Sequence, residues 1–146
     1  MITLLAPHRF EQEVKKSRFI AAAARADSPE EAMERLEALR DPESNHNCWA
    51  YRVGDAYRFS DDGEPGGTAG RPILAAIDAQ KVDHVVVVVT RFFGGIKLGA
   101  GGLARAYGGS AASCVREAQK VEVLPKVELR LSAPFDAVGA VYPLLE

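Results

Sequence analysis

The segment VVVVVTRFFGGIKLGAGG, from Val85 to Gly102, decides the fold. Five consecutive valines are β-branched, and an unbroken apolar run of this kind predicts a strand that is buried on both faces. A glycine-rich connector with two phenylalanines follows, and a long helix is expected to begin at about Gly101. No acidic residue occurs between Val85 and Arg116, whereas the same stretch carries Arg91, Lys97, Arg105 and Arg116. A strand that delivers cations and free amides to a helix N-terminus indicates contact with something negatively charged.

The composition describes an ordinary folded domain. The chain has 146 residues, of which 47% are hydrophobic and 26% charged, so it fits one domain, or one domain with a fragment of a second. The formal net charge is −2, so contact with nucleic acid would need a local cationic patch. Two cysteines are too few for a disulfide framework, and we expect a cytoplasmic protein. Residues 1–6 do not read as a signal peptide, and the longest apolar run is too short to span a bilayer, so no membrane contact is expected.

The hydrophobic pattern predicts an α+β two-layer sandwich, in which a mixed sheet is backed by helices. Ser28, Pro29 and Glu31 form an N-cap, a first helical position and a capping box for a helix that ends near Arg40. The other expected elements are a hairpin arm or long strand over residues 10–24, strands over 46–53 and around 57–59, and helices over 71–80 and 101–120.

The strand from His46 to Val53 alternates, and a turn near Gly54 joins it to the next strand. A two-residue loop would place the aromatic side chains of the two strands on opposite faces. A three-residue loop, residues 54–56, would pair Val53 with Tyr57 and give one continuous aromatic face, so the pattern favours three residues. In that register Arg52 lies opposite Arg58 and beside His46, an unfavourable arrangement of like charges unless an anion shares the face.

The pattern changes near Val123. Residues 127–131 alternate as a strand and residues 136–145 begin a helix, but about 20 residues cannot bury a core of their own. We therefore expect a domain over residues 1–122 and the truncated beginning of a second domain over residues 123–146.

Familiar chemical motifs fit poorly. The glycines from Gly99 match a dinucleotide fingerprint, but nine residues separate Val89 from Gly99, and Lys97 lacks the Ser or Thr of a phosphate-binding P-loop. The carboxylates of residues 61–64 could hold a cation, form a rigid turn or pair with arginines, and they stop short of an EF-hand. His46 and Cys48 would be about 7 Å apart along a strand, which is awkward for a nucleophile and its base. The sequence predicts no metal site and no cofactor.

Five ordered blocks resemble the IMPACT family, which includes the bacterial YigZ-like proteins. The blocks are KSRFI (16–20), HNCWAYR (46–52), SDDGEP (60–65), GTAGRPIL (67–74) and VVTRFFGGIKLG (88–99). The resemblance implies a fold similar to ribosomal proteins and to domain IV of elongation factor G, followed by a ferredoxin-like second domain. It also implies a link to translation, because eukaryotic members compete for the activator of an initiation-factor kinase, and bacterial members are connected with nucleic-acid or ribosome contact.

The leading hypothesis is a non-enzymatic, translation-linked regulatory protein that binds RNA, the ribosome or a regulatory protein through the cationic glycine-rich loop face. Phosphates would be gripped without reading bases. The candidate contacts are Lys16, Arg18, His46, Arg52, Arg58, Arg91, Lys97 and Arg105. One alternative is a metal-dependent enzyme acting on a phosphorylated small molecule, with Asp61, Asp62 and Glu64 holding the metal and Arg91 and Lys97 the phosphate. The other is a pure protein-interaction module.

Overall fold

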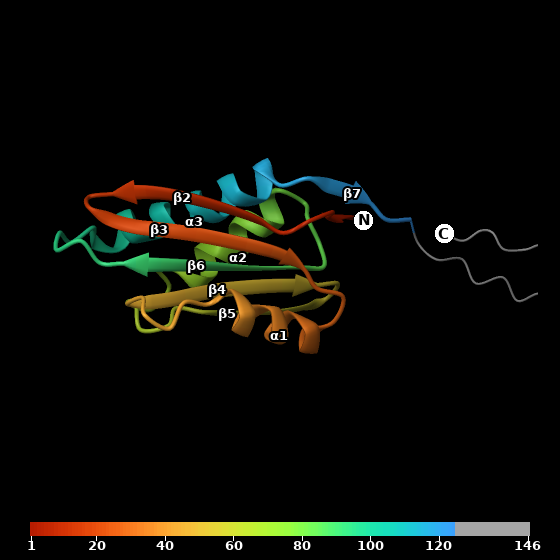
Figure 1. Ribbon diagram of the computed structural model, residues 1–146, viewed down its shortest axis with the longest axis horizontal. Helices are drawn as coiled ribbons and strands as arrows, with labels where there is room; N and C mark the ends of the chain where they lie inside the picture. Colours follow the sequence, from red (N-terminus) through yellow and green to blue (C-terminus); the bar gives the residue numbers. More distant parts are fainter. Residues whose placement is uncertain (125–146) are drawn as a thin grey trace, which may run out of the picture.

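The computed structural model describes residues 1–124, so the strand and helix predicted over residues 127–145 lie outside the described part. Its elements follow one another along the chain as three strands, a helix, two strands, a helix, a strand, a helix and a last strand (Figure 1). They are β1 (Ile2–Leu4), β2 (His8–Val14), β3 (Ser17–Arg25), α1 (Pro29–Leu39), β4 (His46–Val53), β5 (Ala56–Ser60), α2 (Gly70–Ala79), β6 (Val85–Phe92), α3 (Gly99–Glu117) and β7 (Lys120–Glu122).

Five strands form one sheet in the order β2-β3-β6-β4-β5, and every neighbouring pair is antiparallel. β6 occupies the centre, and Val85 to Val89 are completely buried, which confirms the predicted two-sided strand. The strand continues through Arg91 to Phe92, so Arg91 has the same facing as Val85, Val87 and Val89. Because alternate residues of a strand point to the same face, the Arg91 side chain points to the same side of the sheet as these valines.

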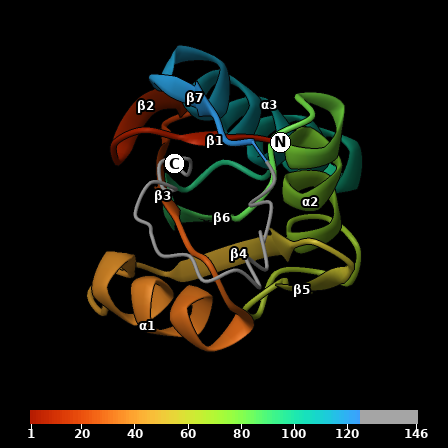
Figure 2. The same ribbon diagram turned by 90° about the vertical axis from the view of Figure 1, so that its right-hand side faces the viewer.

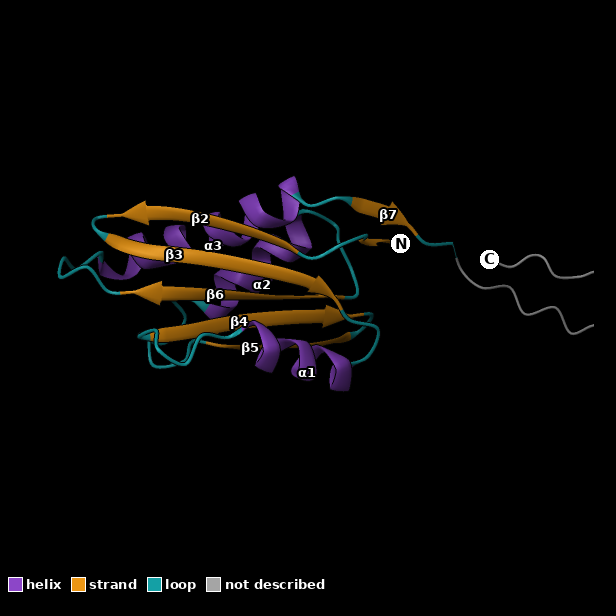
Figure 3. Cartoon of the chain, viewed as in Figure 1, coloured by secondary structure: helices purple, strands orange, loops and turns teal. Residues whose placement is uncertain are grey.

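Helices lie on both faces of the sheet (Figures 2 and 3). α2 and α3 pack on the face that carries Val85, Val87 and Val89, and this side holds the larger core. α1 packs on the other face against Val86 and Val88. The predicted α+β class is confirmed; the sheet is antiparallel throughout, and α1 adds a partial layer behind it.

The segment predicted as a hairpin arm or long strand over residues 10–24 is a hairpin formed by β2 and β3. Val14 pairs with Ser17, and the turn between them consists of Lys15 and Lys16. Both lysines have left-handed φ angles, 48° and 69°, which suit a tight two-residue turn that matches the twist of the strands. The turn places two lysines side by side at one end of the sheet.

The register predicted for β4 and β5 is wrong. Val53 pairs with Ala56, so the loop has two residues, and Gly54 has a φ of +63°, as the first position of a type II′ turn requires. The aromatic side chains are consequently divided between the two faces. Arginines cover them: the guanidinium carbons of Arg52 and Arg58 lie 5.2 Å from the Tyr57 ring centre and 5.5 Å from that of Trp49. These cation–π contacts take the place of aromatic pairing across the two strands. Arg52 pairs with Tyr57 and not with Arg58.

The helices begin close to where the sequence places them. The amide of Glu31 donates to the Ser28 side chain at 3.0 Å, and the Glu31 carboxylate accepts from the Asp27 amide, so the predicted cap of α1 is present. α3 starts at Gly99, two residues earlier than expected, and has no side-chain cap. No helix within residues 1–124 is long and apolar enough to cross a bilayer.

The small β1–β7 sheet joins the two ends of the described part, since Ile2 pairs with Glu122. β7 ends directly before the boundary expected at residues 122 and 123. The division of the chain into two domains at that point stays a prediction.

Candidate functional site

Two loops meet at the end of the sheet where β6 runs out, at the left of Figure 1. A Cβ on Gly94 would lie 2.0 Å from the carbonyl oxygen of Lys16, so the β6–α3 loop and the β2–β3 turn are in direct backbone contact. Only glycine fits at that approach. The contact brings Lys15 and Lys16 to the same end of the molecule as Lys97.

This end carries four exposed cations, which we call the cationic end: Lys15, Lys16, Lys97 and Arg105. Lys15 and Arg105 line one hollow between β2 and α3, and Lys97 lines the neighbouring cavity. None of the four forms an ion pair with an acidic side chain of residues 1–124. Arg18, another predicted contact, is engaged with Glu11 at 2.8 Å. The positive charge of the cationic end is therefore available to an anionic partner.

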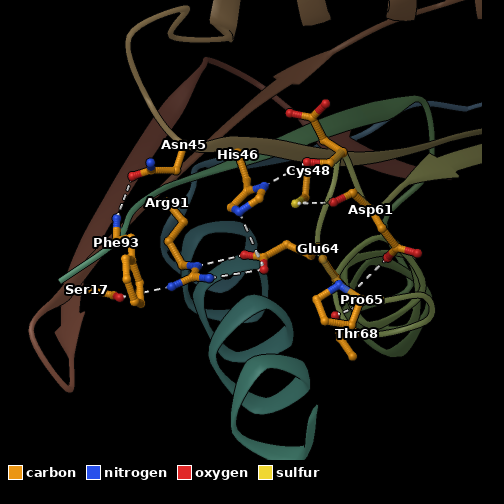
Figure 4. Close-up of polar contacts among 12 residues, drawn as sticks. Ser17, Asn45, His46, Cys48, Asp61, Glu64, Pro65, Thr68, Arg91 and Phe93 are labelled. Atoms are coloured by element: carbon orange, nitrogen blue, oxygen red, sulfur yellow. Dashed lines mark hydrogen bonds and ion pairs between the residues drawn. The ribbon is translucent and has the colours of Figure 1, made fainter. Parts of the chain in front are cut away.

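Arg91 has a different role from the one predicted. Its side chain is 9% exposed and forms a two-pronged pair with Glu64, with Nε–Oε2 at 2.6 Å and Nη2–Oε1 at 3.0 Å (Figure 4). Its Nη1 donates to the Ser17 hydroxyl, and the Tyr107 hydroxyl donates to the same carboxylate. A buried guanidinium with its charge balanced in this way holds the structure together and is not free to grip a phosphate.

Glu64 and Arg91 each stabilise the charged form of the other. Burial alone would raise the pKa of Glu64, but the hydrogen bonds from Arg91 and Tyr107 outweigh it and lower that pKa. Burial works against the Arg91 charge as well, yet the Glu64 carboxylate raises the pKa of the guanidinium. Burial raises the pKa of the Tyr107 hydroxyl, which remains a donor.

His46 lies at the rim of this cluster. Its Nδ1 is 2.8 Å from the carbonyl oxygen of Asp62, and because a carbonyl only accepts, Nδ1 carries a proton. Its Nε2 points toward Glu64 Oε1 at 3.7 Å (Figure 4). Both ring nitrogens of His46 thus face oxygen atoms of residues 62–64.

The three carboxylates proposed for a metal do not converge. Asp61 accepts hydrogen bonds from the amides of Gly67, Ala69 and Gly70. Burial is the largest single effect on its pKa and would raise it, but these bonds, together with the charge of Arg71, outweigh burial and lower the pKa. Asp62 accepts from the amide of Asn47. Residues 1–124 contain no group of His, Cys, Asp or Glu side chains arranged to hold a metal ion. Asp61 and Asp62 are thus engaged with backbone amides of their own loop and of β4.

Two predicted contacts lie away from the cationic end. Arg52, near the far end of β4, binds Asp78 of α2 through Nε and Nη2 at 2.6 and 3.1 Å. Arg58 lies on the α1 face of the sheet, over the Trp49 ring. Neither belongs to the surface that the sequence assigned to them.

A cavity of about 440 Å³ opens between the start of β4 and the β6–α3 loop. Apolar walls come from Pro65, Phe93, Leu98 and Leu103, and polar groups from Asn45, His46 and Lys97. Phe93 and Ile96 of the loop are large and exposed, at 48% and 42%. Phe93 is not among the contacts predicted from the sequence, although an aromatic residue at a glycine-rich tip is the signal that could have indicated it.

The fold and the site define an α+β domain with one cationic end, a buried arginine–glutamate pair beneath it and a cavity beside the pair. The family model described as "Impact N-terminal domain" matches residues 15–115, and the chain belongs to the IMPACT family. It is 56% identical to the "IMPACT family member in pol 5'region" of Thermus thermophilus, over 90% of this chain and 73% of that protein. It is 39% identical to "IMPACT family member YigZ" of Escherichia coli, over 96% of this chain and 72% of the relative.

A solved structure described as a hypothetical protein superposes with a TM-score of 0.79 and 41% identity. The alignment covers 82% of this chain and 62% of the solved chain. The present chain thus spans less than two thirds of that solved chain.

Proposed function

We propose that the chain is a translation-linked regulatory protein that contacts RNA phosphates through its cationic end. The observation that carries the proposal is the gathering of Lys15, Lys16, Lys97 and Arg105, all exposed and without an acidic partner among residues 1–124. Like charges gathered by the β2–β3 turn, the β6–α3 loop and α3 repel one another in the free protein, and a polyanion relieves that repulsion.

The link to translation rests on family membership. The five sequence blocks resemble the IMPACT family, and that resemblance implies a role in translational control. The two cysteines are free and buried, which suits the reducing cytoplasm. A ribosomal or transfer RNA is accordingly the natural anionic partner, and contact with phosphates would be largely independent of base sequence.

The experiment is a titration of fluorescently labelled single-stranded RNA with the protein, followed by anisotropy at several salt concentrations. Four phosphate contacts on a single strand correspond to a slope of about −3 in log affinity against log salt. The double variant Lys97→Gln with Arg105→Gln should weaken binding and make that slope shallower by about 1.4.

A matched control removes the same charges elsewhere. Lys81 precedes β6 at the opposite end of the sheet, and Arg116 lies in the last turn of α3; both are exposed. Lys81→Gln with Arg116→Gln should leave affinity and slope nearly unchanged. RNA binding that is absent at low salt, or lost equally in both double variants, contradicts the proposal and leaves a protein-interaction module as the better interpretation.

A further inference from the structure

We infer that the cavity beside the cationic end receives one unpaired nucleotide of the bound RNA strand. The inference rests on the proposed function and adds to it a defined subsite. Phosphate contact at the surface needs no cavity, whereas a 440 Å³ space walled by Pro65, Phe93, Leu98 and Leu103 is about the size of a single nucleotide and too small for a duplex.

The apolar walls suit the flat face of a base. The Phe93 ring is 48% exposed, and the guanidinium carbon of Arg91 lies 5.2 Å from its centre. The buried Arg91–Glu64 pair thus supports the ring, so Phe93 is held in place although it is exposed. An exposed, supported aromatic ring next to lysines is the usual platform on which single-stranded nucleic acids stack a base.

The polar groups at the mouth suit the edge of a base. The Asn45 side-chain oxygen accepts from the Phe93 amide at 2.7 Å, which assigns its orientation and directs its NH₂ group elsewhere (Figure 4). That NH₂ group makes no hydrogen bond within residues 1–124, so it can donate to a ligand. His46 lines the cavity next to Asn45, with its Nδ1 bound to the Asp62 carbonyl and its Nε2 turned toward Glu64. The NH₂ group of Asn45 can therefore donate to an acceptor on the edge of an unpaired base.

The charge at the cavity is complementary to a nucleotide phosphate. Lys97 lines the cavity, is exposed and has no acidic partner in the described part of the chain. Glu64, the one acidic residue among the lining side chains, is neutralised by Arg91 and hydrogen-bonded by Tyr107. A bound phosphate would therefore meet the lysine and not a free carboxylate.

The test uses short single-stranded RNAs that carry one 2-aminopurine, a base whose fluorescence depends on stacking. We expect binding to change the fluorescence, and Phe93→Leu to abolish that change while weakening affinity roughly 5- to 150-fold, the range for loss of one base–aromatic stack. The salt slope should stay as in the wild type, because no charge is removed. Phe93→Tyr, which keeps a ring, should retain both signals, and a thermal melt of each variant shows that the fold is intact.

The outcomes separate this inference from the proposed function. If the wild type binds RNA with the expected salt slope but Phe93→Leu behaves like the wild type, the nucleotide subsite is wrong and the phosphate-binding proposal stands. If the wild type binds no RNA, both fall. Free adenosine monophosphate provides a further arm: binding as tight as that of the oligonucleotide would identify a free nucleotide as the ligand and overturn the assignment to an RNA strand.

Discussion

The substitution Glu64→Gln tests the ion pair that organises the site. It removes one negative charge at nearly constant volume and leaves the Arg91 guanidinium, only 9% exposed, with an unbalanced charge. Gln also replaces the charged acceptor of the Tyr107 hydroxyl by a neutral amide. Removal of one partner of a buried pair typically costs about 3–5 kcal/mol. For a folded part of this size the corresponding fall in Tm is roughly 10–20 °C.

The assay is urea unfolding followed by the fluorescence of Trp49, the single tryptophan of the chain, with circular dichroism as a second probe. The matched control is Glu11→Gln, which breaks the exposed pair with Arg18, whose partners are about half exposed. An exposed pair contributes only about 0–1 kcal/mol. The two identical substitutions should therefore differ several-fold in their effect on the free energy of unfolding.

A double-mutant cycle with Arg91→Met isolates the interaction. Because Met carries no charge, the double variant should be more stable than the sum of the single effects predicts, by about 0.5–3 kcal/mol. A cost of Glu64→Gln below about 1 kcal/mol, or strictly additive effects in the cycle, would refute the reasoning that the pair is buried and mutually dependent.

Three further predictions concern acid, packing and thiols. Because the pKa of Glu64 is lowered in the folded state, its contribution to stability is present above its ordinary pKa of 4.5 and is lost as the pH falls through the lower folded value. Below pH 4.5 the free energy of unfolding, measured by urea titration, should therefore fall more steeply with decreasing pH in the wild type than in Glu64→Gln. Gly94→Ala should lower Tm markedly because its Cβ would meet the Lys16 backbone, whereas Gly66→Ala, with open space around it, should leave Tm unchanged or slightly raised; equal melts would contradict the loop contact. Burial raises the pKa of both Cys48 and Cys114 to about 12, so neither thiol should react with a thiol reagent at pH 8 until the protein is unfolded, and rapid native labelling would show that the core is open.

The elements were predictable because each has a local cause: β-branched valines for β6, a capping box for α1, a glycine-rich stop before α3. The β4–β5 register was not predictable in this way, because the aromatic pattern favours a three-residue loop, whereas the positive φ of Gly54 forms a two-residue turn. Cation–π contacts to Tyr57 and Trp49 made the divided aromatic arrangement stable. Such contacts depend on where arginine side chains reach, and a one-strand pattern does not contain that information.

Only part of the role of Arg91 can be predicted from the sequence. Its facing follows from the two-residue period that begins at Val85, so its burial could have been deduced by extending β6. Its partner could not be deduced, since Glu64 is 27 residues away and is placed beside Arg91 by a loop, residues 61–69, whose amides bind the Asp61 carboxylate. The sequence alone leaves open whether the acidic loop pairs with the arginines, and in the structure Glu64 of that loop pairs with Arg91.

The buried pair and the cationic end are mechanically connected, and this connection decides how variants must be interpreted. The Ser17 hydroxyl accepts hydrogen bonds from Arg91 Nη1 at 3.1 Å and from the Gly94 amide at 3.2 Å. One side chain thus ties the ion pair to the point where the two loops touch. Loss of RNA binding in an Arg91 variant would follow from displacement of the lysine-bearing loops and would say nothing about phosphate contact by Arg91. Lys97→Gln, which removes a charge without touching Ser17, is the substitution whose effect on RNA binding measures phosphate contact itself.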